Sequence, residues 1–202
     1  MSISLTATDL ACRRGERVLF RGLNLSLAHG EALHIAGANG IGKTSLLRIL
    51  AGLLRPFAGS VSSEGAIGLL DERPGLDPEL PLRKALGFWQ NLDGGSAPSN
   101  ALATMGLEPL LDVPLRYLST GQRKRAAMAA LLNRSVPIWL LDEPLSGLDA
   151  AAIDQVTRLI AAHLSAGGIA VIASHQPLAV PDLQVLELAS HVPSLAEMEA
   201  PE

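Results

Sequence analysis

A glycine-rich stretch in the first quarter of the chain constrains the fold more than any other feature of the sequence. Residues 37–45 have the sequence GANGIGKTS, which matches G-x-x-x-x-G-K-[ST], the pattern of the phosphate-binding P-loop. A short apolar segment at 32–36 precedes the match, and apolar residues at helical spacing follow it up to residue 50. Because a P-loop joins a strand to a helix, these flanks predict a strand–loop–helix unit.

The residue types within this stretch predict how it would hold a nucleotide. Glycines let the backbone turn tightly toward phosphate oxygens, and the helix N-terminus adds unpaired N–H donors and a positive dipole end. Lys43 is expected to contact the β- and γ-phosphates, and the Thr44 hydroxyl to hold Mg²⁺. The predicted nucleotide-binding residues are Gly37, Ala38, Asn39, Gly40, Ile41, Gly42, Lys43, Thr44 and Ser45.

The rest of the pattern predicts an α/β fold with a mainly parallel sheet. Residues 1–36 alternate between apolar and polar, which indicates a small antiparallel sheet ahead of the P-loop. Strands and helices then alternate, as is typical of a parallel sheet. The expected strands cover 66–70, 136–141, 169–173 and 183–189, and the expected helices include 43–50 and 150–165. A further helix is expected to start at an N-cap at Ser119 or Thr120 and to continue through 126–132.

Length and pattern together indicate one domain. We expect residues 1–202 to form a single domain, because the chain is long enough for one substantial core and has no internal repeat. A breaker-rich loop follows residue 70, and the chain from 76 to 117 is mostly helical in pattern. We interpret residues 76–117 as an insertion in the nucleotide-binding core. Together with the helix that follows, they predict a helical subdomain of about 76–130. The last dozen residues are expected to fray.

Composition excludes several classes of function. The formal net charge of −4 gives no electrostatic footprint for nucleic acid. The lone cysteine, Cys12, allows no internal disulfide and suits a reducing compartment. Residues 159–181 lack Asp, Glu, Lys and Arg, yet Gly167-Gly168 and two prolines interrupt them, which favours a helix, a turn and a buried strand over a membrane span. We expect a chain without a signal peptide or membrane span.

Polar residues at two predicted strand ends suggest hydrolytic chemistry. Asp142 ends a buried strand and is expected to hold Mg²⁺ together with Thr44. Glu143, the next residue, is placed to orient or deprotonate an attacking water. His175 follows another strand, at the edge where parallel sheets bind ligands, and is expected to donate a hydrogen bond to the γ-phosphate. Glu143 and His175 are therefore the catalytic candidates.

The segment LSTGQ at 118–122 resembles the signature motif of ATP-binding-cassette (ABC) ATPases. Together with the P-loop, the strand end at 138–143, the segment SGLD at 146–149 and His175, it follows the order of that family over nearly the whole chain. The resemblance implies an ABC-type P-loop NTPase fold, ATP and Mg²⁺ as ligands, ATP hydrolysis, and a head-to-tail dimer enclosing two ATP. The signature residues Ser119, Thr120, Gly121 and Gln122 would face the partner's ATP, and Asp149 would communicate across the interface.

Two further segments, LACRRGERVLF at 10–20 and KTSLLRILAGL at 43–53, resemble the ATPase subunit of the bacterial haem exporter of cytochrome c biogenesis. This narrower resemblance implies a peripheral subunit on the cytoplasmic face of the inner membrane, bound to integral membrane subunits. Its ATP hydrolysis would support haem delivery to a periplasmic chaperone and release of that chaperone. Another ABC exporter, a soluble P-loop kinase-like enzyme and a non-hydrolysing partner remain the alternatives.

Three positions depart from the usual ABC pattern. The first aromatic residue is Phe20, so Arg13 or Arg14 is expected to stack on the base in place of an aromatic ring. Arg73 or a neighbour stands where the family has a glutamine that contacts Mg²⁺ and couples to the membrane partner. Thr120 replaces a small signature residue. The membrane subunit is expected to dock on Phe88, Trp89 and the loop 71–80.

Overall fold

Two sheets form the body of the protein, whose computed structural model describes residues 3–71, 75–92 and 100–193. The larger sheet has the strand order β5-β6-β7-β3-β8, and every neighbouring pair in it is parallel. Its strands are β3 (Ala32–Ala36), β5 (Ile67–Leu70), β6 (Ile138–Asp142), β7 (Ile169–Ala173) and β8 (Gln184–Glu187). The predicted parallel sheet is thereby confirmed, with its edge strand near residues 183–189.

The smaller sheet is antiparallel, as the alternation in residues 1–36 predicts. Its strand order is β2-β1-β4, with β1 (Ser4–Arg14), β2 (Arg17–Ala28) and β4 (Ala58–Glu64). Gly15 turns the β1–β2 hairpin with a φ of 58°, a conformation that glycine adopts without steric cost. Between Cys12 and Arg13 the register of the hairpin shifts, which places one extra β2 residue opposite the end of β1.

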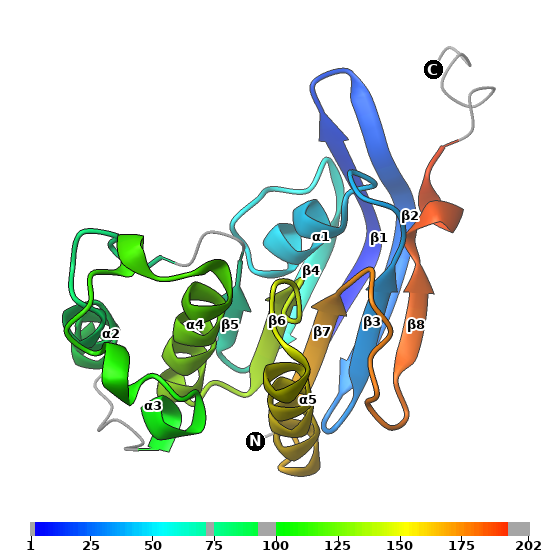
Figure 1. Ribbon diagram of the computed structural model, residues 1–202. Coiled ribbons are helices and arrows are strands. Elements are labelled where there is room, and N and C mark those ends of the chain that lie inside the picture. The colour runs from blue at the N-terminus through cyan, green and yellow to red at the C-terminus, as the bar shows by residue number, and fades with distance from the viewer. Residues whose placement is uncertain (1–2, 72–74, 93–99, 194–202) are drawn as a thin grey trace.

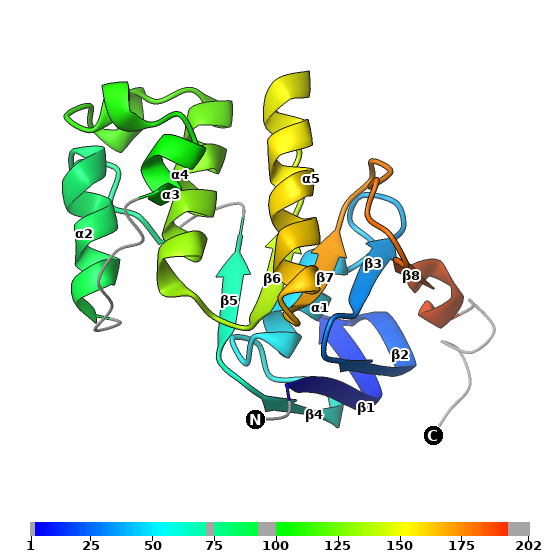
Figure 2. The same ribbon diagram turned by 90° about the horizontal axis from the view of Figure 1, so that it is seen from below.

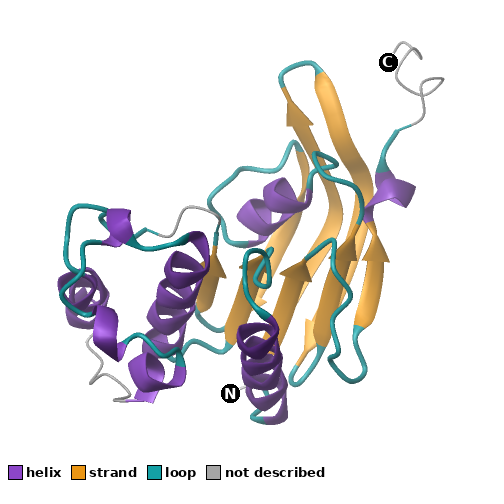
Figure 3. Ribbon diagram, viewed as in Figure 1, coloured by secondary structure: helices purple, strands orange, loops and turns teal. Residues whose placement is uncertain are grey.

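Two α-helices pack on the faces of the parallel sheet, and the other described α-helices lie beyond its β5 edge (Figures 1 and 2). In Figure 2, α5 (Ala150–Ser165) covers one face of the parallel sheet, and α1 (Lys43–Leu50) lies between its other face and the antiparallel sheet. Beyond β5 lie α2 (Leu82–Leu92), α3 (Asn100–Thr104) and α4 (Thr120–Arg134), which form the purely helical side of the molecule in Figure 3. Short 3₁₀ turns η1 (Glu108–Leu110), η2 (Leu115–Tyr117) and η3 (Leu188–His191) complete the order.

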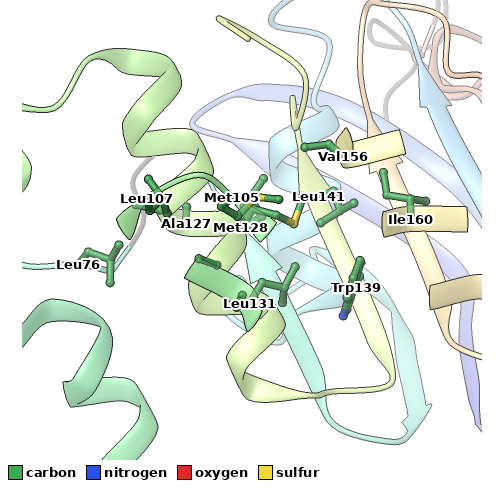
Figure 4. Close-up of a cluster of buried hydrophobic side chains, with 14 of the residues drawn as sticks. Leu76, Met105, Leu107, Ala127, Met128, Leu131, Trp139, Leu141, Val156 and Ile160 are labelled. Atoms are coloured by element: carbon green, nitrogen blue, oxygen red, sulfur yellow. The ribbon is translucent and has the colours of Figure 1, made fainter. Parts of the chain in front are cut away.

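Strand β6 separates two apolar cores. Ile138 and Leu140 face the core that α1 shares with the antiparallel sheet. Trp139 and Leu141 face the other core, where residues of α4 and α5 such as Met128 and Val156 pack (Figure 4). Since both faces are covered, every residue of β6 is buried, and its sequence is a continuous apolar run that ends at Asp142. This burial fixes the strand end from which the acidic residues extend.

The apolar segment 159–181 forms the last turns of α5, a turn at Gly167-Gly168 and strand β7, as expected. No helix in the described parts of the chain is both long and apolar enough to cross a bilayer. Several expectations fall outside the described residues: Arg73, the linker after residue 92 and most of the last dozen residues.

Candidate active site

The P-loop lies between β3 and α1, where its glycines adopt backbone conformations that other residues rarely take. Gly37 has a φ of 143° and Gly42 a φ of 123°. Gly42 is the N-cap of α1, and a Cβ there would come within 3.3 Å of the Leu19 side chain. The loop therefore requires glycine for both conformation and space, and it presents the first N–H groups of α1 at the end of the parallel sheet.

Lys43 and Thr44 follow the loop with their polar groups already engaged. The Lys43 side chain is 6% exposed, and its ammonium donates to the carbonyl oxygens of Gly37 at 2.7 Å and Ala38 at 3.2 Å. The Thr44 hydroxyl donates to Asp142 Oδ2 at 2.7 Å. A cation held over the loop and a hydroxyl–carboxylate pair thus lie side by side at the edge of the sheet.

Glu143 has an unusual backbone conformation. Its φ is 46°, a left-handed value that costs a non-glycine residue about 1–3 kcal/mol. Its N–H donates to Ala173 O at 2.8 Å, and its carboxylate Oε2 lies 2.8 Å from Nδ1 of His175. The two side chains are 19% and 50% exposed. The turn after β6 therefore places a partly exposed carboxylate against the imidazole from the end of β7.

A cavity of about 710 Å³ joins these groups, within the ordinary size range of small-molecule sites. The predicted residues among its lining are Asn39, Gly40, Gly42, Lys43, Thr44, Ser45, Thr120, Asp142, Glu143 and His175. Gly37, Ala38 and Ile41 belong to the same loop but not to the lining. Six of the nine predicted P-loop residues, both predicted metal ligands and both catalytic candidates therefore surround one space.

The donor set suits Mg²⁺ better than a metal held by the protein alone. The Thr44 hydroxyl and the Asp142 carboxylate are hard oxygen ligands that lie together at the edge of the cavity. Within the described ranges, no three His, Cys, Asp or Glu side chains are grouped closely enough to hold a metal ion. Mg²⁺ usually takes one or two protein ligands and completes its shell with phosphate oxygens and water, so the Thr44 and Asp142 oxygens fit it.

The signature segment forms the start of α4. Ser119 caps the helix in a reciprocal capping box: its hydroxyl accepts from Gln122 N at 3.2 Å, and its N–H donates to Gln122 Oε1 at 2.8 Å. A Cβ on Gly121 would lie 2.7 Å from Gly147 O, so glycine permits close approach to the loop after Glu143. Asp149 caps α5 by accepting from Ala152 N at 2.8 Å.

Charged residues that the motifs did not single out complete the site. Lys124 of α4 lines the cavity and donates to the Asp142 carbonyl at 3.3 Å. Arg48 of α1 donates to Asp71 Oδ2 from Nε at 3.1 Å and from Nη2 at 2.8 Å. Asp71 directly follows β5 as Asp142 ends β6, and the pairing of Leu70 with Leu141 puts both acids at one edge. An aspartate at the end of a predicted apolar strand, as at Asp142, is the sequence signal that could have identified Asp71.

The residues expected at the base and at the membrane partner are only partly described. Phe20 is completely buried in the core, so its ring is not part of the site surface. The Arg13 guanidinium lies over the exposed ring of Phe57, 4.7 Å from its centroid. Phe88 is 58% exposed on α2, whereas the side chain of Trp89 lies outside the described part of the structure.

Comparisons with known proteins agree with this geometry. A family model for the ABC transporter matches residues 20–146. The cytochrome c biogenesis ATP-binding export protein CcmA of Novosphingobium aromaticivorans is 57% identical over 94% of this chain and 97% of its own length. The protein of the same name from Sphingopyxis alaskensis is 50% identical over 92% of this chain and 97% of its own.

Solved structures support the same fold. An ATP-binding subunit of an ABC transporter has a TM-score of 0.78 at 22% identity, over 85% of this chain and 79% of that one. A chain of an ABC transporter described as of metal-chelate type, solved in an inward-facing conformation, has a TM-score of 0.72 at 26% identity, over 87% and 74% of the two chains.

The sheet order, the P-loop and the acidic strand end together define an ATPase of the ABC type. The chain belongs to the ABC transporter family and, within it, to the cytochrome c biogenesis ATP-binding export proteins. The predicted family is thereby confirmed.

Proposed function

We propose that the protein is the ATP-hydrolysing subunit of a bacterial haem exporter of cytochrome c biogenesis. The observation that carries this proposal is the single cavity shared by Lys43, the Thr44–Asp142 pair and the Glu143–His175 pair. The names of the relatives supply the export function. Hydrolysis would support haem delivery to a periplasmic chaperone and the release of that chaperone.

The chain's own groups divide the work of hydrolysis among them. Lys43 and the N–H groups of residues 37–45 hold the β- and γ-phosphates by charge and by hydrogen bonds. Thr44 and Asp142 would hold Mg²⁺, which neutralises phosphate charge when bound. Glu143 accepts a proton from, or orients, the attacking water, a role worth about 10²–10⁴-fold in rate. His175 holds the Glu143 carboxylate through Nδ1 and lines the same cavity, where it would contact the γ-phosphate.

A second copy of the chain would complete the site. Ser119, Thr120, Gly121 and Gln122 would meet the ATP bound by the partner's P-loop, because a helix N-terminus with small residues suits an approaching anion. Asp149 would transmit contact across the interface from its position at the start of α5. On this proposal residues 1–202 form one ABC ATPase domain, and its helical subdomain, about 76–130, presents the signature to the partner.

An apolar groove next to the cavity is our proposed docking site for a cytoplasmic segment of the membrane subunit. The groove has a volume of about 450 Å³ and is lined by residues including Leu53, Leu70, Leu76, Leu131 and Arg134. Leu53 is 69% exposed, and Phe88 offers a further exposed ring on α2. Docking there, together with Trp89 and the loop 71–80, would hold the protein on the cytoplasmic face of the inner membrane.

The haem export function is tested in cells that carry only the Glu143→Gln form. Periplasmic and membrane fractions are stained for covalently bound haem, and the protein's level is measured by immunoblot. Loss of all c-type cytochromes with the protein still present is the expected result. Normal amounts of c-type cytochromes would mean that the chain serves another exporter, or that its ATP hydrolysis is not needed for cytochrome c maturation.

A further inference from the structure

A histidine on the P-loop strand stands out among the apolar residues around it. His34 lies in β3, where it pairs with Ile172 of β7 on one side and Val185 of β8 on the other. On the same sheet face Ala32, Ala170 and Ile172 are buried and apolar, whereas Val185 is exposed, and His34 between them is partly buried. The imidazole is therefore partly desolvated at the border of the core, where a polar group needs a hydrogen-bond partner.

The polar partner of His34 is a backbone carbonyl next to the active site. Nε2 of His34 lies 2.9 Å from the carbonyl oxygen of Ser174, the residue that follows β7. A carbonyl only accepts, so Nε2 must carry the proton. Ser174 is itself 1% exposed, and its hydroxyl accepts from Gln176 N at 2.9 Å and donates to Gln176 O at 3.1 Å. The turn that carries His175 is therefore fixed from both sides.

The hydrogen bond from His34 is made to the peptide group that joins Ser174 to His175. The Ser174 carbonyl and the His175 nitrogen belong to one planar unit, so holding the oxygen fixes the orientation of that nitrogen and of the Cα attached to it. His175 is half-exposed and contacts Oε2 of Glu143 at 2.8 Å. A rotation of the peptide would change this distance directly.

We propose that His34 is a positioning residue that aligns His175 with Glu143 through the Ser174 carbonyl. The inference rests on the proposed hydrolytic role of Glu143 and His175. It connects the strand that carries the P-loop to the pair beside the attacking water, so that both are set by β3. His34 itself is not among the residues that line the cavity.

The test compares His34→Leu, which removes the N–H, with His34→Gln, which keeps an amide N–H at similar reach. With purified protein, His34→Leu is expected to lower kcat for MgATP by about ten-fold, the scale of one lost hydrogen bond, and to leave KM within about two-fold. His34→Gln is expected to keep at least about half of the wild-type kcat. A His34→Leu protein with wild-type kcat, or a His34→Gln protein as slow as His34→Leu, would overturn the proposal.

A double variant separates this inference from the proposed function. In a His175→Ala background, His34→Leu should change kcat by less than about two-fold, because the group it positions is gone. An equal loss in both backgrounds would show that His34 acts by another route. If His175→Ala alone kept the wild-type rate, the proposed role of His175 would fail, and the inference with it. If His175→Ala is slow and His34→Leu is not, only the inference fails.

A measurement on the wild-type protein tests the proposal even if the variants do not fold. With ¹⁵N-labelled histidine, the imidazole nitrogen shifts of His34 at pH 8 should be those of the Nε2–H tautomer, in slow exchange with water. A His34 ring protonated on Nδ1 alone would contradict the hydrogen bond and overturn the proposal.

Discussion

At the scale of single residues, the site depends on groups held in conformations that they would not adopt alone. Glu143 is the clearest instance, because its left-handed backbone turns the carboxylate toward His175. Backbone strain of this kind persists only where surrounding contacts hold it, here the Glu143 N–H bond to Ala173 O. Asp142, one residue earlier, stays in the strand and pairs with Thr44.

The strain at Glu143 predicts an order of stability among variants. Glu143→Gly should be more stable to urea unfolding than Glu143→Ala by about 1 kcal/mol, because glycine adopts a φ of 46° freely. Both variants should lose hydrolysis. Equal stability of the two would mean that the left-handed conformation is absent from the protein in solution.

A second residue-scale prediction concerns the nucleotide base. Arg13 is engaged with Phe57, whereas Arg14 is exposed beside Cys12. Burial raises the pKa of the Cys12 thiol, and the nearby charge of Arg14 lowers it in part. We expect the Arg14 guanidinium to be the one that stacks on the base. Arg14→Ala should therefore weaken ATP binding by about two- to thirty-fold, the range of a cation–π contact. Arg13→Ala is the matched control and should weaken it less, as measured with a fluorescent ATP analogue.

At the scale of elements, helix ends and strand ends place the chemistry. Helix α1 begins at the P-loop, α4 begins at the Ser119 capping box, and α5 begins at Asp149. These local devices were readable from the sequence, since motif, cap and periodicity are encoded within a few residues. The sequence allowed either Ser119 or Thr120 as the N-cap of α4, and in the structure the N-cap is Ser119.

Removal of the α4 cap should destabilise the nucleotide-free protein. Ser119→Ala loses the hydroxyl half of the capping box and is expected to lower the free energy of unfolding by about 1 kcal/mol in urea titrations. Ser119→Asp, which preserves a capping oxygen, should recover most of that loss. An unchanged Ser119→Ala protein would contradict the role of the capping box.

The packing of α5 on β6 makes stability depend on pH. His163 stacks on Trp139 with ring centroids 3.8 Å apart, and burial lowers the pKa of His163 below its ordinary value of 6.5. The unfolded chain then takes up the proton more readily, so this contribution is complete above about pH 6.5 and is lost as the pH falls through the folded pKa. His163→Phe keeps the stack and should flatten the pH dependence of the melting temperature between pH 7.5 and 5. Identical pH profiles for the two proteins would refute the assignment.

At the scale of the whole molecule, the nucleotide cavity and the apolar groove share a wall. Asp71 and Ala127 line both, and the Arg48–Asp71 ion pair ties that wall to the P-loop helix. A segment bound in the groove would therefore lie against a wall that it shares with the cavity of the candidate active site. Sequence reasoning did not find this link, because it depends on contacts between residues far apart in the chain.

The same limit explains what else the sequence left open. The strand ends at Asp142 and His175 were predictable, but the contact of His34 with Ser174 requires that β3 lie beside β7, which only the sheet order provides. The positive φ of Glu143 has no signal in residue type, since glutamate rarely adopts it. Local rules thus identified the participants, and topology determined their arrangement.

The groove yields a prediction for assembly. Leu53→Asp should lower co-purification of the membrane subunits by about ten-fold or more, because it places a charge in an apolar contact. Val185→Asp is the matched control, since Val185 is 58% exposed on the edge strand β8 at the other end of the parallel sheet. Basal ATP hydrolysis should be unchanged in Leu53→Asp. Equal co-purification of the two would place the docking surface elsewhere.

The most direct test of the central claim is phosphate release from MgATP by purified wild-type and Glu143→Gln protein, with ATP affinity measured alongside. We expect the variant to bind ATP within about two-fold of wild type and to release phosphate about 10²–10⁴-fold more slowly, as the loss of a general base requires. A Glu143→Gln protein that hydrolyses ATP at the wild-type rate would contradict the account.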